Sequence, residues 1–313
     1  MINDPRYGSL RRLRASGNTG GDHMATVREA FQTFISSLEL TSAEQNEATR
    51  QHNVVRENLR VHLGGIERDI LSGSYSRRTA IRPLNDIDIF IILEEAKHGA
   101  IRGQHPTACL EAVRAALAGA YPGKAAATLQ GRSVNIAFAG TGIAYDIVPA
   151  FNVSEGVYII PDRDRKSWIK TNPEKHKEAL RLANERAGSK LNPLIKAAKH
   201  WNAHNKKPLR SFHLEVMSYG AFKAPPASYP EGLRDLFAFL SSSIAVRCPE
   251  PAGVGPNIDD GMAQDERTRI QVALKQAAET ASRAIVFEGA NRMEEAHGIW
   301  RGLLGPVYPE RGR

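Results

Sequence analysis

The sequence predicts an α+β fold, in which a mixed sheet with flanking helices is followed by a helical lobe. Strand-like segments are confined to about residues 65–160, and after Pro161 the apolar residues recur at the three- and four-residue steps of helices. The chain has 313 residues, a length that favours two structural units over one. We therefore expect a flexible tail over 1–23, an α/β lobe with N-terminal helices over 24–165, and a helical lobe over 166–313.

The composition is that of an ordinary globular protein, with 42% hydrophobic and 24% charged residues. The longest purely aliphatic or aromatic stretch, Ile89 to Leu93, is far shorter than the roughly 20 residues that span a bilayer. Cys109 and Cys248 are too few for a disulfide framework or a thiolate zinc site. These observations predict a soluble, cytoplasmic protein with reduced thiols. The net charge of +8 is compatible with an anionic partner such as phosphate or nucleic acid, and equally with a plain basic surface.

The residues before the sheet are expected to be helical. Residues 1–23 lack the apolar stretch of a secretory signal, and Met24 is a candidate start. Apolar residues at helical spacing predict a first helix from Ala25 to Leu38. A second helix is expected to begin at the cap residue Thr41, because Glu44 follows three residues later, and to end before the pair of glycines at 64–65.

Strand signals then alternate with few helices. Strands are expected at 66–71, 87–93, 133–138 and 143–148, with a helix over about 107–120 between the second and the third. The glycines at 140 and 142 predict a hairpin between the last two strands. The remaining helices are expected at about 173–187, 191–204, 211–222, 230–245, 262–288 and 291–303.

Two carboxylates start the most apolar of these strands. Asp86 and Asp88 are two residues apart, so both project from one face of the strand, while Ile87, Ile89 and Ile91 project from the other. Carboxylates this close repel each other unless a cation lies between them, and divalent ions prefer oxygen ligands. Asp-x-Asp also occurs at exposed strand starts after turns. The pair alone favours neither interpretation.

Two further features favour a functional site. Gly73 and Ser74 lie at the end of a short strand, where a small flexible pair lets backbone N–H groups and a hydroxyl approach a phosphate. Asp146 lies among aliphatic residues in a later strand, a costly position for a charge without a partner. A third acid directed at the first two would complete a two-metal site suited to phosphoryl transfer.

This combination of motifs resembles the DNA polymerase beta-type nucleotidyltransferases. The context Gly73-Ser74-Tyr75-Ser76-Arg77-Arg78-Thr79 before Asn85-Asp86-Ile87-Asp88, and Tyr145-Asp146-Ile147-Val148-Pro149 later, is similar to the cyclic GMP-AMP synthase-like enzymes of bacterial anti-phage (CBASS) signalling. The similarity continues through Leu194 to Trp201 and Ser211 to Glu215, and covers about residues 65–220 well. It implies a bilobed polymerase beta-like core whose helical lobe closes a nucleotide cleft.

The resemblance assigns roles to individual residues. It implies that Asp86, Asp88 and Asp146 are catalytic and hold two Mg²⁺ ions, with Mn²⁺ as a substitute, and that Gly73 and Ser74 grip the donor triphosphate. In the helical lobe, Lys199 and Ser211 match residues that contact or adjoin the triphosphate. Lys196, Lys199 and His200 share one helix face by their spacing, which predicts a cationic edge.

Three assignments keep an alternative. Phe212 matches an aromatic residue that stacks on the donor base, but the apolar residues after it make a core position equally reasonable. Asn172 lies in a stretch that lines the base pocket in relatives, and is also a plausible helix cap before Pro173. Arg77, Arg78 and Arg82 are candidates for phosphate or acceptor contacts, although arginines beside a turn are commonly solvated.

The function implied is joining NTPs, ATP among them, into a cyclic di- or trinucleotide with release of pyrophosphate. The product would activate an effector, and regulatory or conjugation proteins of the same operon are expected partners. The helical half has no cysteine-histidine cluster, so activation by double-stranded DNA through a zinc ribbon is not expected. Two alternatives are a non-cyclising nucleotidyltransferase acting on an RNA end or small molecule, and an inactive nucleotide-binding scaffold.

Overall fold

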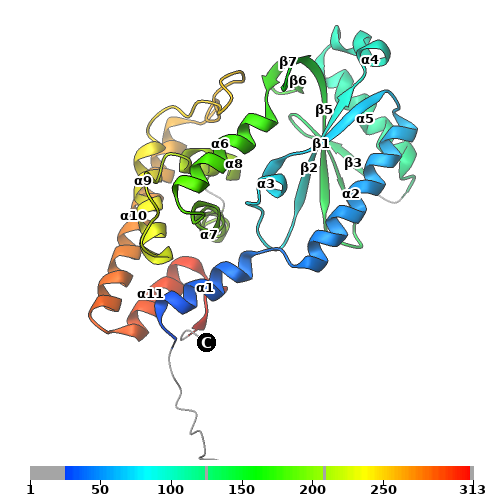
Figure 1. Cartoon of the computed structure of the whole chain (residues 1–313). Coiled ribbons are helices and arrows are strands. Elements are labelled where there is room, and N and C mark those ends of the chain that lie inside the picture. Colours follow the sequence, from blue (N-terminus) through cyan, green and yellow to red (C-terminus); the bar gives the residue numbers. More distant parts are fainter. Residues whose placement is uncertain (1–24, 124–125, 207–208, 311–313) are drawn as a thin grey trace, which may run out of the picture.

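A sheet lobe and a helical lobe lie side by side in the computed structural model, which describes residues 25–123, 126–206 and 209–310 (Figure 1). The tail expected at 1–23 and the candidate start Met24 lie outside the described residues. Figure 1 shows the chain crossing between the lobes twice, first from helix α1 (Val27–Leu38) into α2 (Ser42–His62), and again from strand β7 (Ser167–Thr171) into α6 (Pro173–Arg186). The site expected between the lobes is therefore bounded by both.

The sheet is mixed, as the sequence predicts. Its main path runs β1-β2-β5-β4-β3, with β6 paired to β5 and β7 to β6. The central pair, β2 and β5, is parallel, and the other pairs are antiparallel, including the predicted hairpin of β4 and β5. The remaining strands are β1 (Ile66–Leu71), β2 (Asp86–Leu93), β3 (Ala127–Leu129), β4 (Val134–Ala137), β5 (Ala144–Ser154) and β6 (Val157–Asp162).

The expectation of helix after Pro161 was wrong for one segment, because β7 pairs with β6 before the first helix of the second half. β7 has five residues, and only Thr171 is buried, so it offers too short an alternation to be recognised. The predicted helices are otherwise confirmed, although α8 ends four residues before the expected position. The other helices are α3 (Gly73–Ser76), α4 (Glu95–Arg102), α5 (Pro106–Ala120), α7 (Leu191–His204), α8 (Ser211–Ser218), α9 (Tyr229–Ser243), α10 (Gln264–Gly289) and α11 (Met293–Leu304). Helices α3 and α4 and strands β3 and β6 were not predicted.

The start of α2 forms as its sequence predicts. The Thr41 hydroxyl accepts a hydrogen bond from the Glu44 backbone N–H at 3.2 Å, and the Glu44 carboxylate accepts one from the Thr41 N–H at 2.7 Å. These reciprocal bonds satisfy two backbone donors that a helix start otherwise leaves unpaired. They fix the point where the chain enters the sheet lobe.

The buried apolar residues form two large clusters. One joins α2 and α5 to the strand residues on one face of the sheet, including Ile87, Ile89 and Ile147. The other lies within the helical lobe and includes α1, whose Phe31 ring is 4.7 Å from Trp300 of α11. Packing thus places α1 with the helices, and the division of the chain at residue 165 remains a prediction. On the second face of the sheet a small cluster, with Phe90 and Val148, lies beyond the acids.

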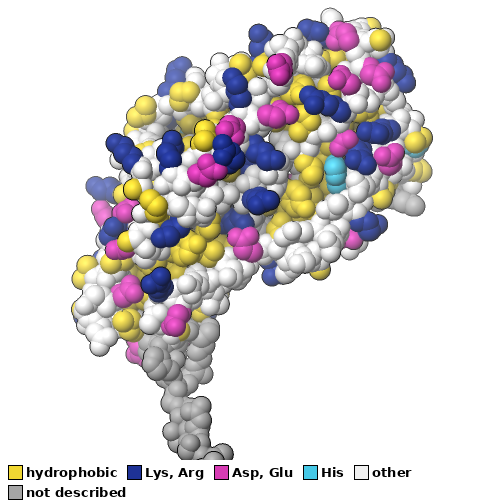
Figure 2. Space-filling model, in the orientation of Figure 1, with side chains coloured by type: hydrophobic (Ala, Val, Ile, Leu, Met, Phe, Trp, Pro, Cys, Tyr) yellow, Lys and Arg dark blue, Asp and Glu magenta, His cyan; other side chains and the backbone are white. Residues whose placement is uncertain are grey.

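The surface carries mixed charge. On the face drawn in Figure 2, basic and acidic side chains are interspersed over both lobes, and apolar side chains gather along the band between them. Within the described ranges, no helix combines the length and hydrophobicity needed to cross a membrane.

A buried ion pair ties α6 to the loop after α9. Glu250 accepts a hydrogen bond from His176 of α6, and also from the backbone N–H groups of Val254 at 3.1 Å and Gly255 at 3.2 Å. Burial alone raises the pKa of Glu250, but the hydrogen bond and charge of His176, together with the two backbone donors, outweigh it and lower the pKa to about 2. The ionised form is therefore the stable one in the folded chain.

We predict that Glu250→Gln lowers the free energy of unfolding by about 1.5–3 kcal/mol at pH 7, the typical value of hydrogen bonds to a charged group. Because folding lowers the pKa from its ordinary 4.5 to about 2, this stability is present above pH 4.5 and is lost as pH falls toward 2. Urea unfolding at pH 7 and pH 3.5 should show a smaller difference between variant and wild type at the lower pH. The exposed Glu67→Gln is the control, and an equal effect at both pH values would contradict the prediction.

Candidate active site

Three carboxylates lie on one face of the two central strands. Asp86 and Asp88 occupy β2, and the fully buried Ile87 between them faces α2 and α5. Asp146 occupies β5, directly opposite Asp88 in the parallel pairing. Since directly paired residues project from the same face, the register brings all three acids together.

These acids are crowded and only partly compensated. The pKa of Asp88 is raised to about 6, first by burial and then by the charges of Asp86 and Asp146, although Arg77 and Lys199 act in the opposite direction. Burial also raises the pKa of Asp146, and its Oδ1 accepts a hydrogen bond from Asn135 Nδ2 at 2.9 Å. Asn135 lies beside Asp146 on β4, and sequence reasoning gave it no role.

The donor set suits a hard divalent cation. Carboxylate oxygens are the ligands that Mg²⁺ prefers, and a bound cation would offset the mutual repulsion of these neighbouring carboxylates. Within the described ranges, no three Asp, Glu, His or Cys side chains already enclose a common point, so the structure presents the ligands without a closed cage.

The expected Gly73-Ser74 motif lies directly against this carboxylate group. Ser72 N–H donates to the Asp88 carbonyl at 2.9 Å, and Gly73 begins the short helix α3 with a φ of +64°. A Cβ built on Gly73 would lie 1.6 Å from Asp88 Oδ2. Only glycine therefore allows both this backbone conformation and this close approach.

Lys199 does not point freely into the space beside the acids. Its Nζ donates to the Thr79 carbonyl and hydroxyl, both at 3.1 Å, and to Glu215 Oε2 at 2.8 Å. An ammonium has three N–H donors, so each has a partner. Lys199 is 6% exposed and Glu215 is fully buried.

Glu215 is the residue that the sequence did not single out. It accepts hydrogen bonds from Lys199, Arg77, Tyr219 and, at 2.5 Å, the Thr79 hydroxyl. Its position one turn after Ser211 was visible in the sequence, but its partners at 77 and 79 lie more than 130 residues away along the chain. No local pattern reveals such a pairing.

The base-stacking candidate Phe212 is partly buried against the helical core. The Arg77 guanidinium carbon lies 4.8 Å from the centre of its ring, a cation–π geometry, and the His176 ring centre is 5.6 Å away. Ser211, beside it, is exposed at the first position of α8. Phe212 thus lies next to Arg77, and Ser211 precedes it in the chain.

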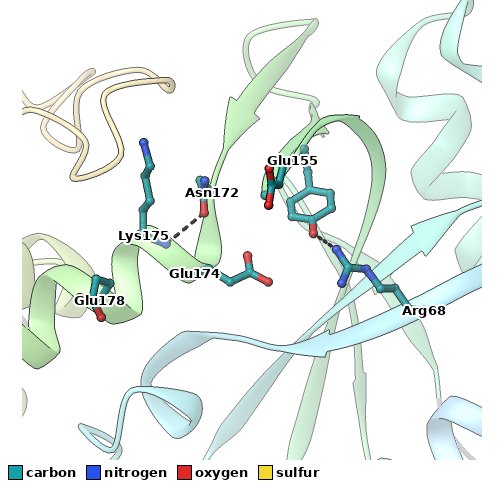
Figure 3. Close-up of a pocket in the computed structure, with 8 residues that line it drawn as sticks. Arg68, Glu155, Asn172, Glu174, Lys175 and Glu178 are labelled. Atoms are coloured by element: carbon teal, nitrogen blue, oxygen red, sulfur yellow. Dashed lines mark hydrogen bonds between the residues drawn. The ribbon is translucent and has the colours of Figure 1, made fainter.

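Asn172 acts as a helix cap. It is 4% exposed, and its Oδ1 accepts a hydrogen bond from Lys175 N–H at 3.0 Å, as Figure 3 shows. It also lines a cavity of about 420 Å³ between the β5–β6 turn and the start of α6, with Arg68, Glu155, Tyr158 and Glu174. Asn172 can therefore cap α6 and contact a base in this cavity from the same position.

The predicted cationic edge on α7 was wrong. Lys196 is buried and forms an ion pair with Glu39, next to the end of α1. His200 binds the Leu304 carbonyl through Nε2 at 2.8 Å. The three side chains share a helix face by spacing, but each is bound by a different part of the chain.

The comparisons with known proteins agree with this geometry. Residues 24–184 match the Second Messenger Oligonucleotide or Dinucleotide Synthetase (SMODS) domain. A cyclic AMP-AMP-AMP synthase from an Acinetobacter strain is 27% identical over 93% of this chain and 88% of its own.

Solved structures show the same fold. Escherichia coli MS115-1 CdnC, in complex with HORMA-deltaN, superposes with a TM-score of 0.72 at 20% identity, covering 90% of this chain and 98% of its own. Vibrio cholerae DncV cyclic AMP-GMP synthase, with the linear intermediate pppA(3′,5′)pG, gives 0.74 at 15% identity, covering 91% and 98%. This chain therefore belongs to the second messenger oligonucleotide or dinucleotide synthetases, the cyclic GMP-AMP synthase-like nucleotidyltransferases of bacteria.

Proposed function

We propose that this nucleotidyltransferase joins NTPs, with ATP among them, into a cyclic di- or trinucleotide second messenger of bacterial anti-phage defence. One observation supports the proposal: three carboxylates lie on one face of β2 and β5, and the Gly73 backbone lies against one of them. In this proposal the carboxylates would bind the cations, beside a segment whose backbone a phosphate can approach. The relatives named cyclic nucleotide synthases support the cyclic product.

The residues divide the reaction between the lobes. Asp86, Asp88 and Asp146 would hold two Mg²⁺ ions, which, when bound, favour deprotonation of the attacking ribose hydroxyl and neutralise the leaving pyrophosphate. Gly73 and Ser74 would bind the donor triphosphate through the backbone and the Ser74 hydroxyl. Asp146, held by Asn135, is the acid we assign nearest the attacking hydroxyl. Lys199 and Ser211 are assigned to the triphosphate side, and Phe212 and Asn172 to the base.

The proposed activity also implies protein partners. The cyclic product would act on an effector protein, and a regulatory protein of the HORMA type is a candidate partner because CdnC forms such a complex.

We predict that the protein with Mg²⁺ and all four NTPs releases pyrophosphate and forms a phosphatase-resistant product, whose mass identifies its bases and ring size. The variant with Asp86→Ala and Asp88→Ala should form no product. Its melting temperature should not fall, because the substitutions remove charges that repel one another.

Three other results would contradict the proposal. A linear product made only on added RNA would support the non-cyclising alternative. ATP binding without any product would support the inactive scaffold. Wild-type activity in the double variant would refute the site assignment itself.

Gly73→Ala should reduce product formation at least 100-fold. The added Cβ cannot coexist with Asp88 Oδ2, and alanine at a φ of +64° is itself strained, so the carboxylate must move away from its neighbours. Initial rates of pyrophosphate release measure the effect.

Gly140→Ala is the matched control, since a Cβ there meets no atom within 4 Å. A Gly73→Ala enzyme that kept half of the wild-type rate would show that Asp88 need not hold its present position.

A further inference from the structure

The structure distinguishes three arginines that the sequence left equivalent. Arg78 is exposed and follows the turn with a φ of 58°. Arg82 lies on the far side of the segment, where its Nε binds Glu44 Oε1 at 3.0 Å and its side chain is 44% exposed. Only the Arg77 side chain is enclosed among these three, at 8% exposure. Burial of an arginine requires compensation or a function for its charge.

Arg77 follows the Gly73-Ser74 segment by one helical turn. Its backbone N–H donates to the Gly73 carbonyl at 3.2 Å, so the arginine and the glycine that touches Asp88 belong to one small unit. The charges of Asp88 and Arg77 act on each other, since Arg77 opposes the rise in the Asp88 pKa. Arg77 is therefore the arginine that is tied by its backbone to the glycine beside Asp88.

Only one edge of the guanidinium is engaged. Nε binds Glu215, and within the described residues neither Nη group has a hydrogen-bond partner. Both unbonded Nη atoms keep some accessible surface, because neither is among the fully buried polar atoms that lack a partner. A guanidinium presents five N–H donors in a rigid fork, so Arg77 can keep its bond to Glu215 and still bind a phosphate bidentately.

Lys199 is in the opposite situation. All three of its donors already bind Thr79 and Glu215. It can reach a phosphate only by giving up one of these bonds. The cluster of Arg77, Lys199 and Glu215 holds two cations and one carboxylate, so it retains positive charge that an anion can neutralise.

We propose that Arg77 is a substrate-contacting residue, whose free Nη groups bind the nucleotide triphosphate, and that Glu215 is a positioning residue that holds the guanidinium in place. This inference rests on the proposed function, because it takes the triphosphate to lie beside Asp88. Lys199 completes the charge balance of Glu215. The guanidinium packs over the face of the Phe212 ring.

Arg77→Lys tests the contact, because it keeps the charge and removes the fork of N–H donors. The lysine lacks the planar fork of the guanidinium, so while it pairs with Glu215 it cannot bind a phosphate bidentately. We therefore expect the dissociation constant for ATP with Mg²⁺, and the KM for ATP, to rise about 10- to 100-fold, the range for a lost charge-assisted hydrogen bond. Binding of adenosine, which has no phosphate, should be unchanged. The melting temperature should change little, since the ammonium still pairs with Glu215.

Arg78→Lys is the matched control, and its ATP affinity should equal that of wild type. An Arg77→Lys protein that binds ATP within twofold of wild type would overturn the proposal. So would an equal loss for adenosine, or an equal loss in Arg78→Lys.

Glu215→Gln tests the positioning role. We expect it to weaken ATP binding as Arg77→Lys does, and the double variant to be no weaker than Arg77→Lys alone, because Glu215 acts through Arg77. Additive losses would assign Glu215 a separate structural role and overturn this part of the proposal. A wild type that binds ATP but makes no cyclic product would overturn the proposed function and leave the assignment of Arg77 standing.

Discussion

One buried carboxylate, Glu215, accepts hydrogen bonds from both lobes. Arg77 and Thr79 reach it from the segment after β1, while Lys199 and Tyr219 reach it from the helices. Burial raises the pKa of Glu215, but the charges of Lys199 and Arg77 and the bonds from Lys199 and Thr79 lower it to about 2. The group is therefore ionised at neutral pH. Because an unpaired buried charge costs several kcal/mol, the relative position of the lobes is fixed by the requirement that all partners meet there.

The acids on the sheet show the opposite balance. Glu215 accepts hydrogen bonds from four residues. Asp88, in contrast, lies beside two like charges, and the pKa of Asp88 rises to about 6. The two lobes thus carry two groups of opposite charge. Asp86, Asp88 and Asp146 form a group that lacks cations. Arg77 and Lys199 share the single carboxylate Glu215, so this second group keeps positive charge. A nucleotide triphosphate with divalent ions would neutralise both groups at once, because the ions would bind the carboxylates and the phosphates would bind the guanidinium. Under the proposed function, the charges that are unfavourable in the free protein would be those that select this ligand.

The sequence was most informative where function is encoded locally. The acid pair at 86 and 88, its apolar opposite face and the glycine at 73 are short-range patterns, and the strand register explains why they coincide. The partner of a buried charge could not be predicted from the sequence, because only the folded structure brings residues that are far apart in the chain together. Lys196 binds Glu39 and Lys199 binds Glu215, although both lysines looked alike on one helix face. β7 was missed for a related reason: a five-residue strand is defined by its neighbour β6 and not by its own alternation.

The segment from Gly73 to Thr79 connects these two groups of charges. At its start, the missing side chain of Gly73 allows contact with Asp88, and at its end Arg77 and Thr79 bind Glu215. The Ser74 carbonyl accepts hydrogen bonds from the Thr79 and Ala80 N–H groups at 2.9 and 3.1 Å, so the segment closes on itself as one rigid turn. A few covalent bonds and the hydrogen bonds from Ser72 N–H to Asp88 and from Arg77 N–H to Gly73 therefore link Asp88 to Arg77. Since Arg77 also lies against the Phe212 ring, this single short turn connects the carboxylates of the sheet with the buried Glu215 and the aromatic ring of the helical lobe.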